Sequence, residues 1–282
     1  NIQGGGHQGD LGAVYYGQYN ESAYDWNSSV ILPNGSFTAI ECKSSWWQFS
    51  DFAVQFTSPG TPTTNATGLK FTRPNRDRGR GAFGRMNNVC VNRGFYGVDI
   101  NGHFDWKIEG CSILNGDGYG FLLRQDATYT HPSPNDASHS DSTITGCSIF
   151  NNLAGGILIQ AGGGYRITNN KINYGSPTSA SGIAVQPNLI ETTPDAVVEP
   201  LLIANNSIEG QKWGINFSRV SGSTTQIVWG TITGNQIWTG AQAIIWNDDG
   251  PWINGMTVSG NTLQVGETGA TVMSISGTVD ST

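Results

Sequence analysis

Apolar and polar residues follow one six-residue pattern that recurs along the chain. Each copy reads apolar, polar, Gly or Asn, Asn or Cys, polar, apolar. The copies are MNNVCV (86–91), IEGCSI (108–113), ITGCSI (144–149), ITNNKI (167–172), IANNSI (203–208), ITGNQI (232–237) and VSGNTL (258–263), after a degenerate FSDFAV (49–54). The pattern has a period of two and is too short for a helix, so each copy predicts two short β-strands joined by a corner.

A second apolar segment, usually led by Gly, follows most copies. These segments are GVDI (97–100), GFLL (120–123), GILI (156–159), GIAV (182–185), GINF (214–217) and AIIW (243–246). Successive copies of the first motif begin 22 to 36 residues apart. A shortest spacing with variable additions is typical of a solenoid with loop insertions. We therefore expect coils of three strands, stacked in parallel about 4.8 Å apart.

The asparagines suit the corner of such a coil. Asn tolerates the left-handed backbone of a tight corner, and its amide is able to bond to the next coil. Asn170, Asn206, Asn235 and Asn261 occupy the stacking position, and Cys111 and Cys147 replace them in two earlier coils. The parallel side chains suit a disulfide poorly, so we expect free buried thiols.

Together the two motifs resemble the right-handed parallel β-helix of the pectin-lyase-like superfamily, over roughly residues 45–275. The resemblance implies an all-β fold, a single-stranded right-handed parallel β-helix with long loops inserted on one edge. We expect first or irregular coils in residues 1–45, about eight coils in 46–275 and a tail in 276–282. In that superfamily the substrate groove commonly lies along the Gly-led sheet and its flanking loops.

The Gly-led strands present two outward columns of side chains. The first column reads Asp99, Leu122, Leu158, Ala184, Asn216 and Ile245. The second, polar throughout, reads Asn101, Arg124, Gln160, Gln186, Ser218 and Asn247. Exposed leucines in the first column would need a cover, such as a loop, a partner subunit or a sugar ring.

Four long insertions follow the Gly-led strands, at 125–141, 187–200, 219–228 and 248–254. Stacking would gather them along one edge, and insertions on one face of a repeat protein often mark its binding face. Amides, carboxylates and aromatic rings along a groove suit a polysaccharide. The predicted substrate-binding residues are Asn101, Arg124, Gln160, Gln186, Asn216, Asn247, Trp252 and Tyr129.

Glycoside hydrolysis needs two carboxyl groups, about 5–5.5 Å apart for retention or 6.5–9.5 Å for inversion. The catalytic candidates are Asp99, Asp117, Asp126, Asp248 and Asp249. The Asp-Asp pair of WNDDGPW is similar to an element of polygalacturonases, although the Gly-His-Gly and Arg-Ile-Lys elements of that family are absent. A lyase would instead use Arg124 to neutralise a uronic acid, with Tyr129, His131 or Lys107 as the base.

Composition narrows the classes of partner. The net charge is −7 and only 12% of the residues are charged, which argues against nucleic acid and anionic membranes. No apolar run is long enough to span a membrane, and the cysteines lack metal spacing, so we predict neither a cofactor nor a metal. The chain begins without Met and shows no signal peptide, which suggests an excised or processed fragment.

Within the superfamily, the low charge, the abundant Ser, Thr, Asn and Gly and the irregular coil lengths are similar to a bacteriophage tailspike. That resemblance implies a homotrimer in the virion tail that binds and cuts bacterial surface polysaccharide, more as a hydrolase than as a lyase. Two alternatives remain open at this point. One is a non-catalytic receptor-binding or stalk segment, and the other is a secreted pectinase-type enzyme or lyase.

Overall fold

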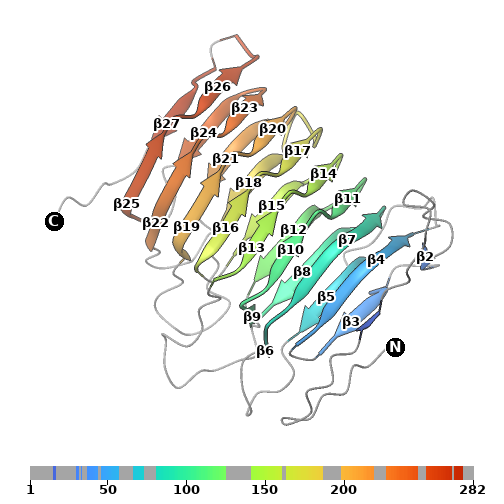
Figure 1. The fold of residues 1–282 in the computed structure, drawn as a ribbon. Helices are drawn as coiled ribbons and strands as arrows, with labels where there is room; N and C mark the ends of the chain where they lie inside the picture. Colours follow the sequence, from blue (N-terminus) through green and yellow to red (C-terminus); the bar gives the residue numbers. More distant parts are fainter. Residues whose placement is uncertain are drawn as a thin grey trace.

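The structure is a computed structural model of the 282-residue chain. It describes residues 15–16, 30–31, 33, 37–43, 46–56, 66–72, 81–124, 141–160, 163–186, 198–218, 227–246, 252–268 and 270–275. Every regular element within these ranges is a β-strand, and the strands stack in parallel along one axis (Figure 1).

Three rows of strands form the faces of the stack, with one strand of each row in every complete coil. The first row holds β10 (Lys107–Glu109), β13 (Thr143–Thr145), β16 (Tyr165–Thr168), β19 (Val198–Ala204), β22 (Ile227–Thr233) and β25 (Trp252–Ser259). The second row holds β11 (Ser112–Leu114), β14 (Ser148–Phe150), β17 (Lys171–Asn173), β20 (Ser207–Glu209), β23 (Gln236–Thr239) and β26 (Thr262–Val265). The third row holds β12 (Tyr119–Arg124), β15 (Gly155–Ile159), β18 (Ser181–Val185), β21 (Trp213–Phe217), β24 (Gln242–Trp246) and β27 (Met273–Ile275).

The coils near the N-terminus are built differently. Their strands are β1 (Tyr15–Tyr16), β2 (Val30–Ile31), β3 (Ile40–Cys42), β4 (Gln48–Gln55), β5 (Thr67–Thr72), β6 (Gly81–Ala82), β7 (Arg85–Asn92), β8 (Tyr96–Asn101) and β9 (His103–Phe104). Strands β4 and β7 each run through the corner, so β7 pairs with both β10 and β11 and joins the first two rows into one sheet. Strands β8, β5 and β3 extend the third row. The fold is a right-handed parallel β-helix, as the sequence predicts.

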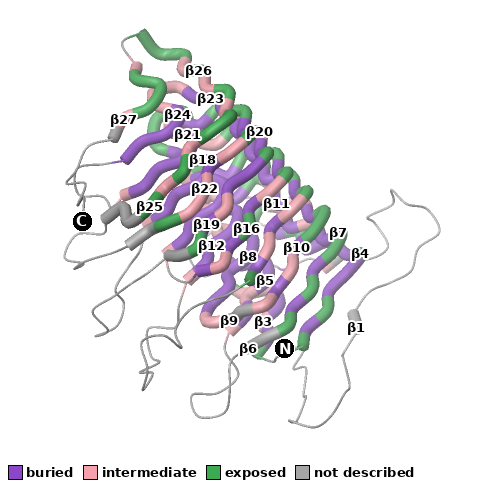
Figure 2. The backbone as a smooth tube through the Cα atoms, turned by 60° about the vertical axis from the view of Figure 1, so that its left-hand side comes forward, coloured by how far each residue is buried: buried purple, intermediate pink, exposed green. Residues whose placement is uncertain are grey.

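Inward apolar side chains from all three rows fill the solenoid. In the third row two inward columns are fully buried, Val98, Phe121, Ile157, Ile183 and Ile215, and Ile100, Leu123, Ile159, Val185 and Phe217. Trp246 also points inward, as predicted, and stacks on Phe217 with ring centroids 4.1 Å apart. Figure 2 shows purple, buried stretches in the strands of successive coils. The apolar core therefore runs along the stack, and each coil is held mainly by its neighbours.

The predicted asparagine ladder lies at the corner between the first two rows. Asn170 Nδ2 donates to Asn206 Oδ1 at 3.0 Å, and Asn206 Nδ2 donates to Asn235 Oδ1 at 3.0 Å. The preceding residue supplies the left-handed backbone, with φ of 58° at Asn169 and 57° at Asn205. The ladder is buried and bonded, which offsets the cost of placing amides in the interior.

Cysteines continue this ladder toward the N-terminus, and Cys111 and Cys147 are free and buried, as predicted; Cys42 and Cys90 are also free. The backbone N–H of Cys147 donates to Asn170 Oδ1 at 3.0 Å, so a hydrogen bond joins the coil that contains Cys147 to the coil that contains Asn170. Burial raises the pKa of Cys90, while a hydrogen bond with Cys147 and burial raise the pKa of Cys111. A raised pKa keeps the thiols of Cys90 and Cys111 neutral, the form in which a thiol is poorly reactive.

A second, exposed ladder that the sequence analysis missed follows the second row. Asn115 Nδ2 donates to Asn92 Oδ1 at 2.8 Å, and Asn151 Nδ2 donates to Asn115 Oδ1 at 2.9 Å. Asn115 and Asn151 have φ of 57° and 54°, so they too form left-handed corners. Tyr174 stands at the next position of this corner with the same backbone, at φ 57°.

Candidate functional site

The outward face of the third row carries the columns that the sequence predicts. Strand pairing places Leu122 between Asp99 and Leu158, and Ala184 next to Asn216, in the predicted register. Backbone hydrogen bonds stack Gln160 on Leu123 and Gln186 on Ile159, each at 2.8 Å. The assignment of side chains to this face is therefore correct.

Asp99 and Arg124 form an ion pair on this face. Arg124 Nε donates to Asp99 Oδ1 at 2.9 Å and Nη2 donates to Oδ2 at 2.6 Å, which is a bidentate contact. Asp99 is only 2% exposed. A buried carboxylate held by a two-pronged guanidinium is well suited to fixing the two strands. The catalytic role of Asp99 and the substrate-binding role of Arg124 stay predictions.

The apolar middle of the first outward column is covered, by tyrosine side chains and not by a loop, a partner subunit or a sugar ring. Leu122 and Leu158 are 4% and 6% exposed and cluster with Ala184. The physical reason is that Tyr96 and Tyr119 pack against this cluster. Burial raises the pKa of Tyr119 to about 12, the nearby Tyr96 adds to the rise, and a hydrogen bond with Ser181 opposes it.

The remaining predicted residues that the structure describes are scattered over this face. Asn101 is 8% exposed, and its Oδ1 is buried without a hydrogen-bond partner in the described structure. Asn216 donates to Ser181 Oγ at 3.2 Å, and Gln160 and Gln186 are half-buried. Asp117 lies in the turn before β12, at the edge opposite Arg124. Asp126, Tyr129, Asn247, Asp248, Asp249 and the side chain of Trp252 lie outside the described residues.

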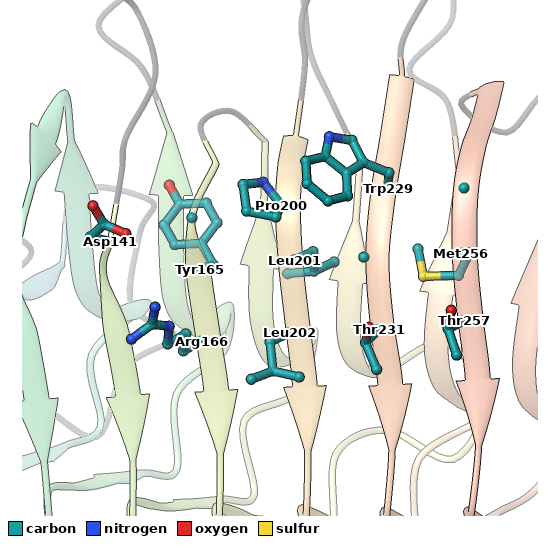
Figure 3. Close-up of a pocket in the computed structure, with 13 residues that line it drawn as sticks. Asp141, Tyr165, Arg166, Pro200, Leu201, Leu202, Trp229, Thr231, Met256 and Thr257 are labelled. Atoms are coloured by element: carbon teal, nitrogen blue, oxygen red, sulfur yellow. The ribbon is translucent and has the colours of Figure 1, made fainter.

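A groove opens on the first row, where the long insertions return to the stack. Its volume is about 510 Å³, and it crosses the beginnings of β16, β19, β22 and β25 (Figure 3). Its described lining consists of Asp141, Gly164, Tyr165, Arg166, Pro200, Leu201, Leu202, Trp229, Gly230, Thr231, Gly255, Met256 and Thr257. The insertions that were predicted to form the binding face follow the polar third-row column in the chain and lead into the first-row strands that carry this groove.

Two irregularities in strand pairing position Trp229 at the groove. The register of β19 against β22 shifts between Val198 and Leu201, and the register of β22 against β25 shifts after Val228. Pro200 lies in the first irregularity, a usual place for proline in a sheet. Bulges re-aim side chains and are common beside active sites. Trp229 is 44% exposed, and its ring lies beside Pro200 in Figure 3.

Two glycines make room for this arrangement. A Cβ on Gly230 would lie 2.0 Å from the carbonyl oxygen of Leu201, so no other residue fits there. Gly255, paired with Trp229 across β22 and β25, has φ of 153°, a backbone conformation that L side chains rarely adopt. The backbone around Trp229 is therefore specialised, unlike that of the regular strands.

The floor of the groove is an outward column of paired residues, Arg166, Leu202, Thr231 and Thr257. Arg166 is exposed, and no described residue forms an ion pair with it. Asp141 is also exposed, with φ of 57°, at the same end of the groove. The groove thus combines the exposed Trp229 ring, the hydroxyls of Thr231 and Thr257, and one charged side chain of each sign. Sugars are bound by groups of these kinds.

Trp229 is not among the residues predicted from the sequence because it directly follows the insertion 219–228, in a segment expected to be a regular strand. The signal is present in IVWGTIT, where a Trp precedes Gly at a strand that should alternate in and out. The bulges that turn Trp229 outward depend on pairing with β19 and β25, and a single strand does not reveal them.

Neither a metal centre nor a membrane helix appears within the described ranges. These residues contain no group of three or more His, Cys, Asp or Glu side chains placed to hold a metal ion. They also contain no helix with the length and apolar character needed to cross a membrane.

Comparison with protein families identifies the class that the fold defines. A model described as "Right handed beta helix region" matches residues 96–281, about two thirds of the chain. The chain belongs to this right-handed β-helix family. No curated protein and no solved structure matches it significantly.

Proposed function

We propose that this β-helix binds a bacterial surface polysaccharide, capsule or O-antigen, and depolymerises it in the manner of a bacteriophage tailspike. The observation that carries the proposal is the groove under Trp229, where bulges and glycines hold an indole ring over hydroxyl and charged side chains. A right-handed β-helix is a fold in which polysaccharide-acting enzymes are common. The proposal includes a homotrimer in the virion tail; a secreted enzyme is the alternative.

The polymer would lie along the stack, with Trp229 against a sugar ring and Thr231 and Thr257 bonded to hydroxyls. Cleavage by an endo-glycosidase would need a pair of carboxyl groups. Asp141 lines the groove. Asp126, Asp248 and Asp249 belong to insertions that leave the third row and return at the first, so they are the proposed partners of Asp141.

A non-catalytic receptor-binding role is the second candidate, and one observation favours it. Asp99 is buried in an ion pair, and Asp141 is the only carboxylate in the described lining of the groove. A groove with a single carboxylate would bind a sugar chain without hydrolysing it by the two-carboxylate mechanism.

Incubation with a panel of purified capsular and O-antigen polysaccharides separates these functions. New reducing ends without an unsaturated product would support hydrolysis. Ultraviolet absorption from an unsaturated uronic acid would indicate a lyase, with Arg124 or Arg166 neutralising the acid. Binding without cleavage would favour the receptor-binding role, and the absence of any binding would contradict both.

A further inference from the structure

The second row carries exposed aromatic side chains, whereas the groove is lined by residues of the first row and the segments leading into it. Its outer column, in order of the coils, is Leu114, Phe150, Asn173, Glu209, Trp238 and Gln264. Phe150 is 40% exposed and Trp238 is 57% exposed. Tyr174, next to Asn173, is 54% exposed and meets Phe150 edge to face, with ring centroids 5.1 Å apart. We call Phe150, Tyr174 and Trp238 the aromatic stripe.

Tyr174 adopts a backbone conformation that works against folding. Its φ is 57°, where the two coils before it use Asn115 and Asn151 and the coil after it has Gly210; Arg93, in an earlier coil, has φ of 68° at the same corner. Asn and Gly adopt this left-handed conformation readily, whereas a bulky residue there is strained. Strain of this kind points to function when it is observed and the surrounding structure maintains it.

Gly210 is shaped to admit the Tyr174 ring. A Cβ built on Gly210 would lie 3.2 Å from Tyr174 Cδ1 and 3.4 Å from Tyr174 Cα. Gly210 itself has φ of 81°, so it is the residue type that suits both the corner and the close approach. Two successive coils are therefore adapted to display one exposed tyrosine.

Hydrogen-bonding groups lie beside and beneath the aromatic stripe. Asn173 is 2% exposed, and its Oδ1 has no hydrogen-bond partner in the described structure. The adjacent outward column is polar, with exposed Ser148, Lys171 and Gln236 in successive or nearby coils. Rings alternating with amide, hydroxyl and ammonium groups along parallel coils form a linear surface, not a compact patch.

From these observations we propose that the aromatic stripe is a second glycan-binding track, separate from the groove. The extent of the stripe favours a sugar chain over a second copy of the protein. An aromatic side chain buries about 150–250 Å² when covered completely, so three half-exposed rings offer about 300 Å². A stable protein interface needs about 800 Å² from each partner. The choice of a glycan as ligand rests on the proposed function, but the stripe itself does not.

The experiment measures binding to an immobilised panel of purified capsular and O-antigen polysaccharides. It compares the wild-type chain with Tyr174→Asn and Trp238→Ala. Tyr174→Asn restores the residue type of the preceding corners, so its melting temperature should equal or exceed that of the wild type. Each variant should bind about three- to tenfold more weakly, as expected when one stacking ring is lost.

Trp46→Ala is the matched control, because Trp46 is 65% exposed but stacks on Phe83 outside the stripe. The Trp229→Ala variant should keep residual polysaccharide binding. The double variant, which also carries Trp238→Ala, should lose that residual binding. Stripe variants that bind as tightly as Trp46→Ala would overturn the inference, as would a lower oligomeric mass, which would make the stripe a subunit interface. If the wild type itself binds no polysaccharide, the proposed function fails first and the glycan assignment fails with it.

Discussion

At the scale of single residues, the groove depends on backbone positions more than on its polar side chains. Gly230 lies where strand β22 passes closest to β19, and a Cβ there would collide with the Leu201 carbonyl oxygen. Trp229 is the neighbouring residue, so any shift of this segment moves the indole ring. Stability and site geometry are therefore coupled at this position.

Gly230→Ala should destabilise the chain and disturb the groove together. Forcing a methyl group into a filled space lowers the free energy of unfolding by about 1–3 kcal/mol. The methyl group would meet backbone atoms, so no flexible side chain is able to move aside. Gly266→Ala is the control, since its new Cβ would lie an ordinary 3.8 Å from the Thr239 carbonyl oxygen. Chemical denaturation measures both, and equal stability of the two variants would contradict the model of a crowded β19–β22 contact.

Tyr119 gives a pH dependence at the alkaline end. Its pKa is raised to about 12, mainly by burial, whereas a tyrosine in the unfolded chain ionises near pH 10. The unfolded chain therefore releases its proton first, so stability is complete below about pH 10 and falls between about pH 10 and 12. Tyr119→Phe should flatten this fall in denaturation midpoints measured across that range. An unchanged slope would show that Tyr119 titrates normally.

At the scale of strands and corners, the buried ladder is the device that keeps successive coils in register. Asn206 accepts from the backbone N–H and the Nδ2 of Asn170, and it donates to Asn235 and to the Ile167 carbonyl. The exposed ladder of Asn92, Asn115 and Asn151 also joins successive coils by amide-to-amide bonds, but it lies at the surface, where water competes.

Asn206→Ala should destabilise the protein by about 3 kcal/mol, because it leaves buried groups of Asn170 and Ile167 without these partners. Asn92→Ala, in the exposed ladder, should cost less than about 1 kcal/mol, because it removes only the acceptor of the Asn115 amide at the surface. Thermal melts of the two variants test the comparison. A larger loss for Asn92→Ala would mean that the outer corner, and not the inner one, holds the coils.

The sequence allowed the coil, the inner ladder, the free thiols and the side-chain directions of the third row to be predicted. These features repeat, so each copy supports the others. Predictions were weaker wherever one coil differs from the rest. The fused strands β4 and β7, the bulges around Trp229 and the bulky residue at the Tyr174 corner depend on contacts between coils. The functional features proposed for this chain are of that irregular kind.

At the scale of the whole molecule, the chain presents several faces that differ in chemistry. The first row carries the groove, the second row carries the aromatic stripe, and the third row is mainly a buried ion pair with an apolar cluster. Binding a long polymer on more than one face raises its effective concentration at the groove. An assembly of several chains would multiply this effect.

The proposed tailspike assembly predicts a mass in solution of three times the 30.1 kDa chain mass. Light scattering coupled to size-exclusion chromatography measures it directly. Side-by-side β-helices need to bury apolar surface between them, and the groove and the aromatic stripe must stay accessible in the trimer if both bind polysaccharide. A monomer at all concentrations would argue for the secreted-enzyme alternative.

The most direct test of the account is the affinity of groove variants for a polysaccharide that the wild type binds. Trp229→Ala should weaken binding by at least about tenfold, because the ring supplies the stacking surface, whereas Trp229→Phe should retain most of the affinity. Circular dichroism would check that both variants keep the β-helix. If Trp229→Ala binds as tightly as the wild type while remaining folded, the groove is not the polysaccharide site and the central claim is wrong.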